Sequence, residues 1–167
     1  SEATYTTKNL TIYMYLYGFY LFFDFAGYSL MAVGVSKIFG IDTPMNFNKP
    51  FLAKDMKDFW NRWHMSLSHW FRDFVFSRLV FAMFKKKIFK SSLTTAMVAY
   101  IVNMTLMGVW HGINFSYLLY GLYHGIILAI TEYFQKIKFY KNNKNKKWFE
   151  YSSIFITFNL VMFGFFI

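Results

Sequence analysis

The sequence lacks cysteine altogether, and among its 167 residues it has only 8 Asp or Glu and 2 Pro. Without cysteine, disulfides, thiolate nucleophiles and thiolate-bound metals are excluded. Charged residues make up 16% of the chain, below the roughly one quarter that is typical of soluble domains. Apolar residues make up 56% and aromatic residues 25%. This composition predicts a membrane protein.

The positive charge is concentrated in a few places. The net charge is +10, and many of the lysines lie in two short stretches, "KKKIFK" (85–90) and "KIKFYKNNKNKKW" (136–148), which flank apolar runs. This pattern favours loops on the cytoplasmic side of a lipid membrane over a nucleic-acid-binding surface. We therefore expect the chain to lie in a lipid membrane and not to bind nucleic acid.

Four apolar runs are candidate membrane spans: Leu10–Phe39, Leu93–Trp110, Phe115–Tyr133 and Ser152–Ile167. The first is long enough for one tilted helix or a broken one. The second and third lie between the two Lys-rich stretches, so they predict a hairpin whose turn points away from the cytoplasm. The last run is shorter than the about 20 residues that a span needs, which suggests a fragment.

The expected fold class is therefore an all-α polytopic membrane protein, located in the cell membrane with several passes. We expect residues 1–167 to be the C-terminal portion of one membrane-embedded domain, with about four spans or partial spans and an amphipathic segment at 58–84.

The segment 58–84 differs from the apolar runs because it carries many polar groups. On a helix its apolar residues form one face: Phe59, Trp63, Leu67, Trp70, Phe74 and Phe81. Its polar residues form two stripes, one of Arg62, Ser66, His69 and Asp73, the other of His64, Ser68 and Arg72. Because these groups would lack partners in hydrocarbon, the pattern predicts an interfacial or re-entrant helix buried among other helices.

The pattern G-x-x-H-G occurs twice in "GVWHGINFSYLLYGLYHG" (108–125). Small residues four apart predict close packing between membrane helices. An ionisable residue at membrane depth is a functional candidate, although either histidine could instead be structural and bonded to a backbone carbonyl. If the chain turns near Gly112, His111 lies at the turn and His124 about 15 Å along the returning helix. His111 is then the catalytic candidate, and His124 is structural support.

A neutral imidazole, with an ordinary pKa near 6.5, can deprotonate a hydroxyl as it attacks an activated acyl group. The sequence has no G-x-S-x-G elbow and no phosphate-binding glycine loop. The four histidines and Asp24 lack the compact spacing of a metal motif, so we expect no metal site. A transporter or channel subunit is an alternative, but paired carboxylates and inverted repeats are missing.

Three blocks in this order, "FDFAGYS" (23–29), "FWNRWHMSLSHWFRDF" (59–74) and "GVWHG" (108–112), resemble the membrane-bound O-acyltransferase family. The resemblance implies a many-helix protein around a funnel or tunnel. It also implies that the histidine of the W-H-G block, His111, is catalytic, and that His64 of the R-W-H block is a second catalytic candidate. We expect four further residues to shape the site: Trp110, Asn103, Arg62 and Asp73.

Within the family, the blocks look most like the branch that takes part in D-alanylation of teichoic acid. Alginate-type O-acetyltransferases share most of the blocks, but usually have a Leu-Gly-Gly turn where this chain reads "FSRLVFAMFKKK", and polysaccharide O-acetylation is kept as the alternative. The resemblance implies a donor held as a thioester on the phosphopantetheine of a cytoplasmic D-alanyl carrier protein. The chain itself would bind no cofactor. A membrane-anchored partner and the teichoic acid acceptor would lie on the extracellular side.

The carrier protein needs a docking surface on the cytoplasmic face. Val80, Phe81 and Lys85 would offer a small apolar anchor with a basic rim for an acidic partner. The alternative is that this segment lies on anionic lipid.

Overall fold

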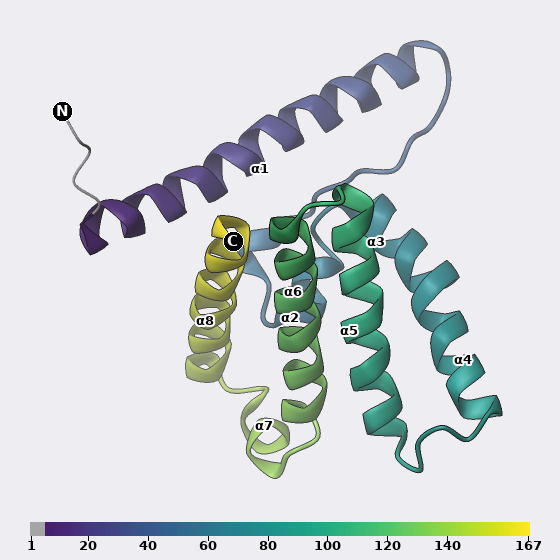
Figure 1. Ribbon diagram of the computed structural model, residues 1–167. Coiled ribbons are helices and arrows are strands. Elements are labelled where there is room, and N and C mark those ends of the chain that lie inside the picture. The colour runs from purple at the N-terminus through teal and green to yellow at the C-terminus, as the bar shows by residue number, and fades with distance from the viewer. Residues whose placement is uncertain (1–5) are drawn as a thin grey trace.

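The computed structural model describes residues 6–167, and in this part of the chain every regular element is a helix. The elements are α1 (Thr7–Ile38), η1 (Pro50–Leu52), α2 (Met56–Trp60), α3 (Met65–Phe71), the π-helical turn η2 (Arg72–Phe76), α4 (Ser77–Lys85), α5 (Ser92–His111), α6 (Phe115–Phe134), α7 (Lys138–Asn143) and α8 (Lys147–Phe166). Helices α5, α6 and α8 stand side by side, and α1 runs obliquely past one end of them (Figure 1). The predicted all-α membrane fold is confirmed.

Helix α1 is one unbroken helix, which settles the alternative that the sequence left open. Thr6 caps its N-terminus by accepting a hydrogen bond from the Asn9 backbone N–H, and Gly40, with φ +72°, follows its end. At the rise of an α-helix, α1 is about 48 Å long, more than the about 30 Å of bilayer hydrocarbon. The helix therefore has to tilt in a membrane. Its contact with the bundle is made mainly with α8.

Three helices of the described chain are long and apolar enough to cross a membrane: α1, α5 and α8. Helix α8 begins at Lys147 and has 20 residues, so the prediction that the last apolar run is too short for a span was wrong. The sequence-based estimate counted the apolar run from Ser152. The helix also includes the amphipathic residues 147–151 that precede this run. Helix α6 also has 20 residues, but it is not among these three candidate membrane-spanning helices.

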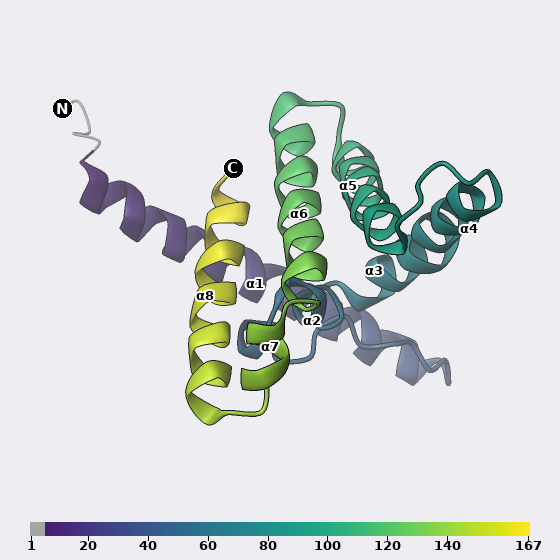
Figure 2. The same ribbon diagram turned by 90° about the horizontal axis from the view of Figure 1, so that it is seen from below.

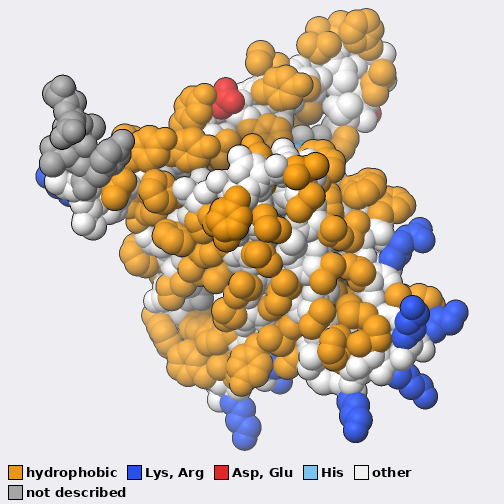
Figure 3. All heavy atoms as spheres, viewed as in Figure 1, with side chains coloured by type: hydrophobic (Ala, Val, Ile, Leu, Met, Phe, Trp, Pro, Cys, Tyr) orange, Lys and Arg blue, Asp and Glu red, His pale blue; other side chains and the backbone are white. Residues whose placement is uncertain are grey.

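Helices α5 and α6 form the predicted hairpin, with bounds within about one residue of those expected. The connections α4–α5 and α6–α8 lie at the same end of the bundle (Figure 1). Lysine and arginine side chains gather toward that end (Figure 3). We call this the Lys-rich end, and the opposite end, which carries the α5–α6 turn, the turn end.

Glycines bring α5 and α6 into close contact. A Cβ atom at Gly108, Gly121 or Gly125 would lie 2.2 Å from the Tyr117 carbonyl oxygen, 2.5 Å from the Met104 carbonyl oxygen, or 2.8 Å from the Ile101 Cα. The predicted packing role is thus confirmed for these three glycines. Gly112 instead caps the end of α5 and lies against the Tyr117 ring.

The segment 58–84 is not a single helix, and this corrects the sequence-based prediction. Helix α2 ends at Trp60, the chain turns, and α3 begins after His64, which has φ 43°. The π-helical turn η2 then changes the angular register again. As a result Phe59 and Trp63 are buried, whereas Trp70 and Phe81 are 52% and 70% exposed. Seen at 90° in Figure 2, α3 and α4 run on away from α6 and α8, on the far side of α5.

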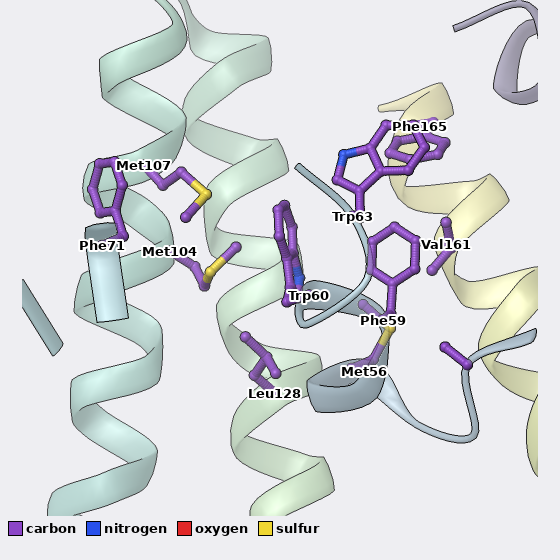
Figure 4. Packing of buried hydrophobic residues seen from close by; sticks show 11 residues of the cluster. Met56, Phe59, Trp60, Trp63, Phe71, Met104, Met107, Leu128, Val161 and Phe165 are labelled. Carbon is purple, nitrogen blue, oxygen red and sulfur yellow. The ribbon is translucent and has the colours of Figure 1, made fainter. Parts of the chain in front are cut away.

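The first part of this segment enters the bundle, as expected for a re-entrant segment. Its side chains Met56, Phe59, Trp60 and Trp63 fill the space between α6 and α8 (Figure 4). Asp55 caps α2 by accepting hydrogen bonds from the backbone N–H groups of Lys57 and Asp58, and it also accepts one from Gln135 Nε2 at 2.8 Å. The Lys57 ammonium pairs with Glu132 of α6. Packing and polar contacts together fix α2 against α6.

Candidate active site

A cavity of about 430 Å³ lies toward the turn end, and we call it the histidine cavity. Its lining comes from α1, the α2–α3 segment, the α5–α6 hairpin and the end of the chain: Tyr17, Leu21, Phe25, Trp60, Trp63, His64, Leu67, His111, Asn114, Ser116, Tyr117, Tyr120, Phe165 and Ile167. The two histidines that the sequence singled out for chemistry therefore face the same space, although they come from different parts of the chain.

His64 is placed by an unusual backbone. It occupies the left-handed region, with φ 43° and ψ 54°, just before α3, a conformation that histidine adopts more readily than most residues. Its ring lies edge-on to Phe25 with 4.7 Å between ring centroids. Burial, and to a smaller extent the nearby His111, lowers the pKa of His64 to about 4. His64 is therefore a neutral imidazole near pH 7.

His111 is the last residue of α5, and the chain leaves the helix at Gly112. Its side chain is exposed and lines the histidine cavity, so an incoming molecule can reach it. The ring packs against Trp110 and Tyr117 with centroid distances of 4.9 and 6.1 Å. Trp110 itself is 59% exposed and does not line this cavity. It flanks the catalytic candidate from outside.

The other residues expected at the site are spread more widely. Asn103 lines a second cavity, closer to the Lys-rich end, of about 240 Å³. Arg62 forms an ion pair with Asp58 at 2.7 Å. Asp73 is exposed and pairs with Arg72 at 2.9 Å, and this hydrogen bond lowers the pKa of Asp73. Arg62 and Asp73 line neither of the two cavities, because the break before α3 and the π-helical turn rotate the predicted polar stripe.

The residues expected to dock a carrier protein lie on α4. Phe81 is 70% exposed, Lys85 is exposed and Val80 is half-buried. Helix α4 ends toward the Lys-rich end (Figure 1). An exposed aromatic ring beside lysines is thus present where the sequence placed it.

His124 occupies a different position from His111. It is fully buried, and its ring contacts Trp60 and Tyr120 with centroid distances of 5.2 and 4.5 Å. A Cβ at Gly164 of α8 would lie 2.6 Å from His124 Nε2. His124 therefore lies in the contact between α6 and α8, and its role as structural support stays a prediction.

Several lining residues escaped the sequence analysis. Trp60 lines both cavities and separates them. Tyr117 and Tyr120 follow the W-H-G block at helical spacing, and this was the signal that could have placed them on the face of α6 near His111. Trp60 gave no such signal, because its place depends on the turn after α2. Among residues 6–167, no three His, Asp or Glu side chains are grouped as a metal ion would require.

Comparison with known proteins agrees with this architecture. The model of the membrane-bound O-acyltransferase family matches residues 3–167. Teichoic acid D-alanyltransferases of Streptococcus thermophilus and Bacillus subtilis are each 54% identical, over 164 and 157 residues, which cover 92% and 93% of this chain and 40% of each relative. A probable alginate O-acetylase of Pseudomonas aeruginosa is 39% identical over 110 residues, which cover 66% of this chain and 20% of that protein.

The chain thus spans about 40% of the length of the D-alanyltransferases that it matches. The family match covers nearly all of its residues, including both histidines of the cavity. The chain belongs to the membrane-bound O-acyltransferase family.

Proposed function

We propose that this chain carries the histidine cavity of a membrane O-acyltransferase that takes part in D-alanylation of teichoic acid. The observation that carries the proposal is the meeting of His64 and His111 in one cavity of about 430 Å³. The 54% identity to teichoic acid D-alanyltransferases supports the choice of acyl group and acceptor.

The donor in this proposal is D-alanine held as a thioester on the phosphopantetheine arm of a carrier protein. His111 accepts the proton of the acceptor hydroxyl while the hydroxyl oxygen bonds to the thioester carbonyl carbon. The carbon–sulfur bond then breaks, and the departing thiolate takes up the proton. The products are an ester and a free thiol, and the chain needs no bound cofactor of its own.

His64 has a different role from His111 in this proposal. Because its pKa is lowered to about 4, it offers a neutral ring to the reacting groups. A neutral imidazole donates one hydrogen bond and accepts another, so His64 orients the reactants without adding a positive charge. The left-handed backbone at φ 43° aims the ring into the cavity.

The proposal places the chain in the cell membrane as a multi-pass protein, with its Lys-rich end toward the cytoplasm. The carrier protein docks there on Val80, Phe81 and Lys85, by an apolar anchor with a basic rim. His111 then lies toward the outer face. A membrane-anchored partner protein and teichoic acid approach from that side.

The test is His111→Ala in the full-length protein. We expect D-alanine incorporation to be abolished while membrane insertion and carrier binding are kept, because only the proton acceptor is removed. His69→Ala is the matched control, since His69 lines neither cavity, and it should keep full activity. Full activity of His111→Ala would refute the role of His111.

Polysaccharide O-acetylation is the second candidate, and the 39% identity to an alginate O-acetylase favours it. The same cavity chemistry serves an acetyl thioester. Offering the purified protein D-alanyl and acetyl donors in competition separates the two functions.

A further inference from the structure

A short segment of the connection between α1 and η1 pairs with the chain on both sides of His64. The connection runs back from the end of α1 toward the bundle (Figure 1), and we call its residues 46–48 the strap. The Asn48 backbone N–H donates to the Arg62 carbonyl, and the Met65 backbone N–H donates to the Asn46 carbonyl, both at 3.0 Å. One bond precedes His64 and the other follows it, so the strap closes the turn that holds the histidine.

The Asn46 side chain adds three hydrogen bonds to this pairing. Its Oδ1 accepts from the backbone N–H of Ser66 at 3.3 Å and from the Ser66 hydroxyl at 2.7 Å. Its Nδ2 donates to the Ser29 hydroxyl at 3.3 Å. One side chain thus joins α1 to the first turn of α3, directly after His64.

The strap also connects to the block "FDFAGYS" (23–29), which has no part in the proposed chemistry. Ser29 ends this block and is 6% exposed, and the bond from the strap is the one hydrogen bond of its hydroxyl within residues 6–167. Phe25 of the same block lies edge-on to the His64 ring, and Phe47 of the strap packs edge-on to Phe25 with 5.0 Å between ring centroids. The first block and the strap therefore enclose His64 together.

These contacts matter because the backbone of His64 is strained. Its φ of 43° lies in the left-handed region, which residues other than glycine avoid because of the Cβ atom. Such a conformation persists only where the surrounding structure holds it. The place of the His64 ring in the histidine cavity therefore depends on the contacts that fix this turn.

We propose that Asn46 is a positioning residue for His64 in acyl transfer. Its carbonyl and its side-chain amide hold the left-handed turn, and the turn aims the imidazole at the reacting groups. Asn46 lines neither cavity, so it acts through His64 and does not touch the substrate. The inference rests on the proposed function, since it takes His64 to orient the reactants.

The experiment compares Asn46→Ala with Asn48→Ala in the full-length protein. Asn46→Ala removes the three side-chain hydrogen bonds and keeps the backbone pairing. We expect kcat to fall by about 10- to 100-fold, the scale of a displacement of about 1 Å in an active site. KM for the donor should stay nearly unchanged, because Asn46 does not contact the cavity.

Asn48→Ala is the matched control. Asn48 lies two residues further along the strap, and its side chain forms no hydrogen bond within residues 6–167, whereas its backbone bonds survive the substitution. This variant should keep the wild-type kcat. If Asn46→Ala fails to fold, Ser66→Ala is the milder variant, since it removes one of the three bonds, and it should lower kcat in the same direction.

A double-mutant cycle separates positioning from a general loss of structure. Effects of residues that act as a unit are not additive. In a His64→Ala background, Asn46→Ala should therefore cause no further fall in kcat. A fall by the same factor in both backgrounds would show a merely structural role and would overturn the proposal.

Histidine-selective NMR provides a second measurement, which requires no activity. In the wild type the pKa of His64 should lie at about 4. In Asn46→Ala, or in Ser66→Ala, the displaced ring should have a pKa closer to the ordinary value of about 6.5, while Asn48→Ala should match the wild type. An unchanged His64 titration in the folded variants would overturn the proposal, whatever the residual activity of His64→Ala.

The two measurements also separate this proposal from the proposed function. A shifted His64 titration in a protein that transfers no D-alanine would refute the proposed function and leave the role of Asn46 in placing His64 standing. D-Alanine transfer with an unchanged titration in Asn46→Ala would do the reverse.

Discussion

Gly121→Ala tests how closely α5 and α6 approach. A Cβ at this position would lie 2.5 Å from the Met104 carbonyl oxygen and 2.9 Å from the Thr105 Cα, where ordinary contacts begin at 3.4 Å. Both atoms belong to the backbone, so the helices have to separate locally by about 0.5–0.9 Å. Overpacking of this kind costs about 1–3 kcal/mol. For a cost in the middle of that range, about 2 kcal/mol, the better helix propensity of alanine offsets up to about 1 kcal/mol, which leaves a net loss of about 1–2 kcal/mol.

Gly27→Ala in α1 is the matched control, because nothing lies within 4 Å of a Cβ at that position. Thermal denaturation of both variants in detergent measures the difference. We expect a lower melting temperature for Gly121→Ala, and an unchanged or raised one for Gly27→Ala. Gly121→Ala should also reduce acyl transfer, since separation of the helices displaces the end of α5 that carries His111. Equal melting temperatures for the two variants would refute the packing argument.

Three further predictions concern other parts of the chain. His64 has a pKa of about 4 in the folded protein, below its ordinary 6.5, so the unfolded chain binds more protons between these values. The free energy of unfolding should therefore fall as the pH drops from about 6.5 to 4, and His64→Gln should flatten this dependence in denaturation series. Lys57→Met leaves the largely buried Glu132 carboxylate without its closest ammonium, so the free energy of unfolding should fall by about 1–3 kcal/mol. Adding Glu132→Gln removes the unpaired charge and should restore much of the lost melting temperature in thermal denaturation. Phe81→Ser removes a ring that is 70% exposed, so it should leave the melting temperature unchanged but weaken carrier binding in a pull-down; equal carrier binding would exclude this docking surface.

The α5–α6 hairpin shows what could be predicted from local sequence. Its helices are apolar runs of the length that a bilayer requires, they are bounded by lysines, and Gly112 ends the first of them. Each of these signals lies within a single helical turn or a single apolar run of the sequence. The small residues of the two G-x-x-H-G copies likewise predicted close packing, and three of them contact the partner helix backbone.

The segment after Asp58 shows where such reasoning fails. Counting positions around a regular helix placed Arg62 and Asp73 on one stripe, beside the site. The left-handed residue His64 and the π-helical turn η2 break that count. Neither feature is encoded by periodicity, because counting positions assumes one regular helix through the whole segment.

The sequence by itself determined the membrane character, the helices that are long apolar runs and the Lys-rich end. These properties follow from composition and local spacing. Only the tertiary structure decided that His64 and His111 share one cavity, that Trp60 divides this cavity from a second one, and that Arg62 and Asp73 face elsewhere. The physical reason is that a cavity is built by contacts between residues far apart in the chain, and those contacts depend on the turns between helices.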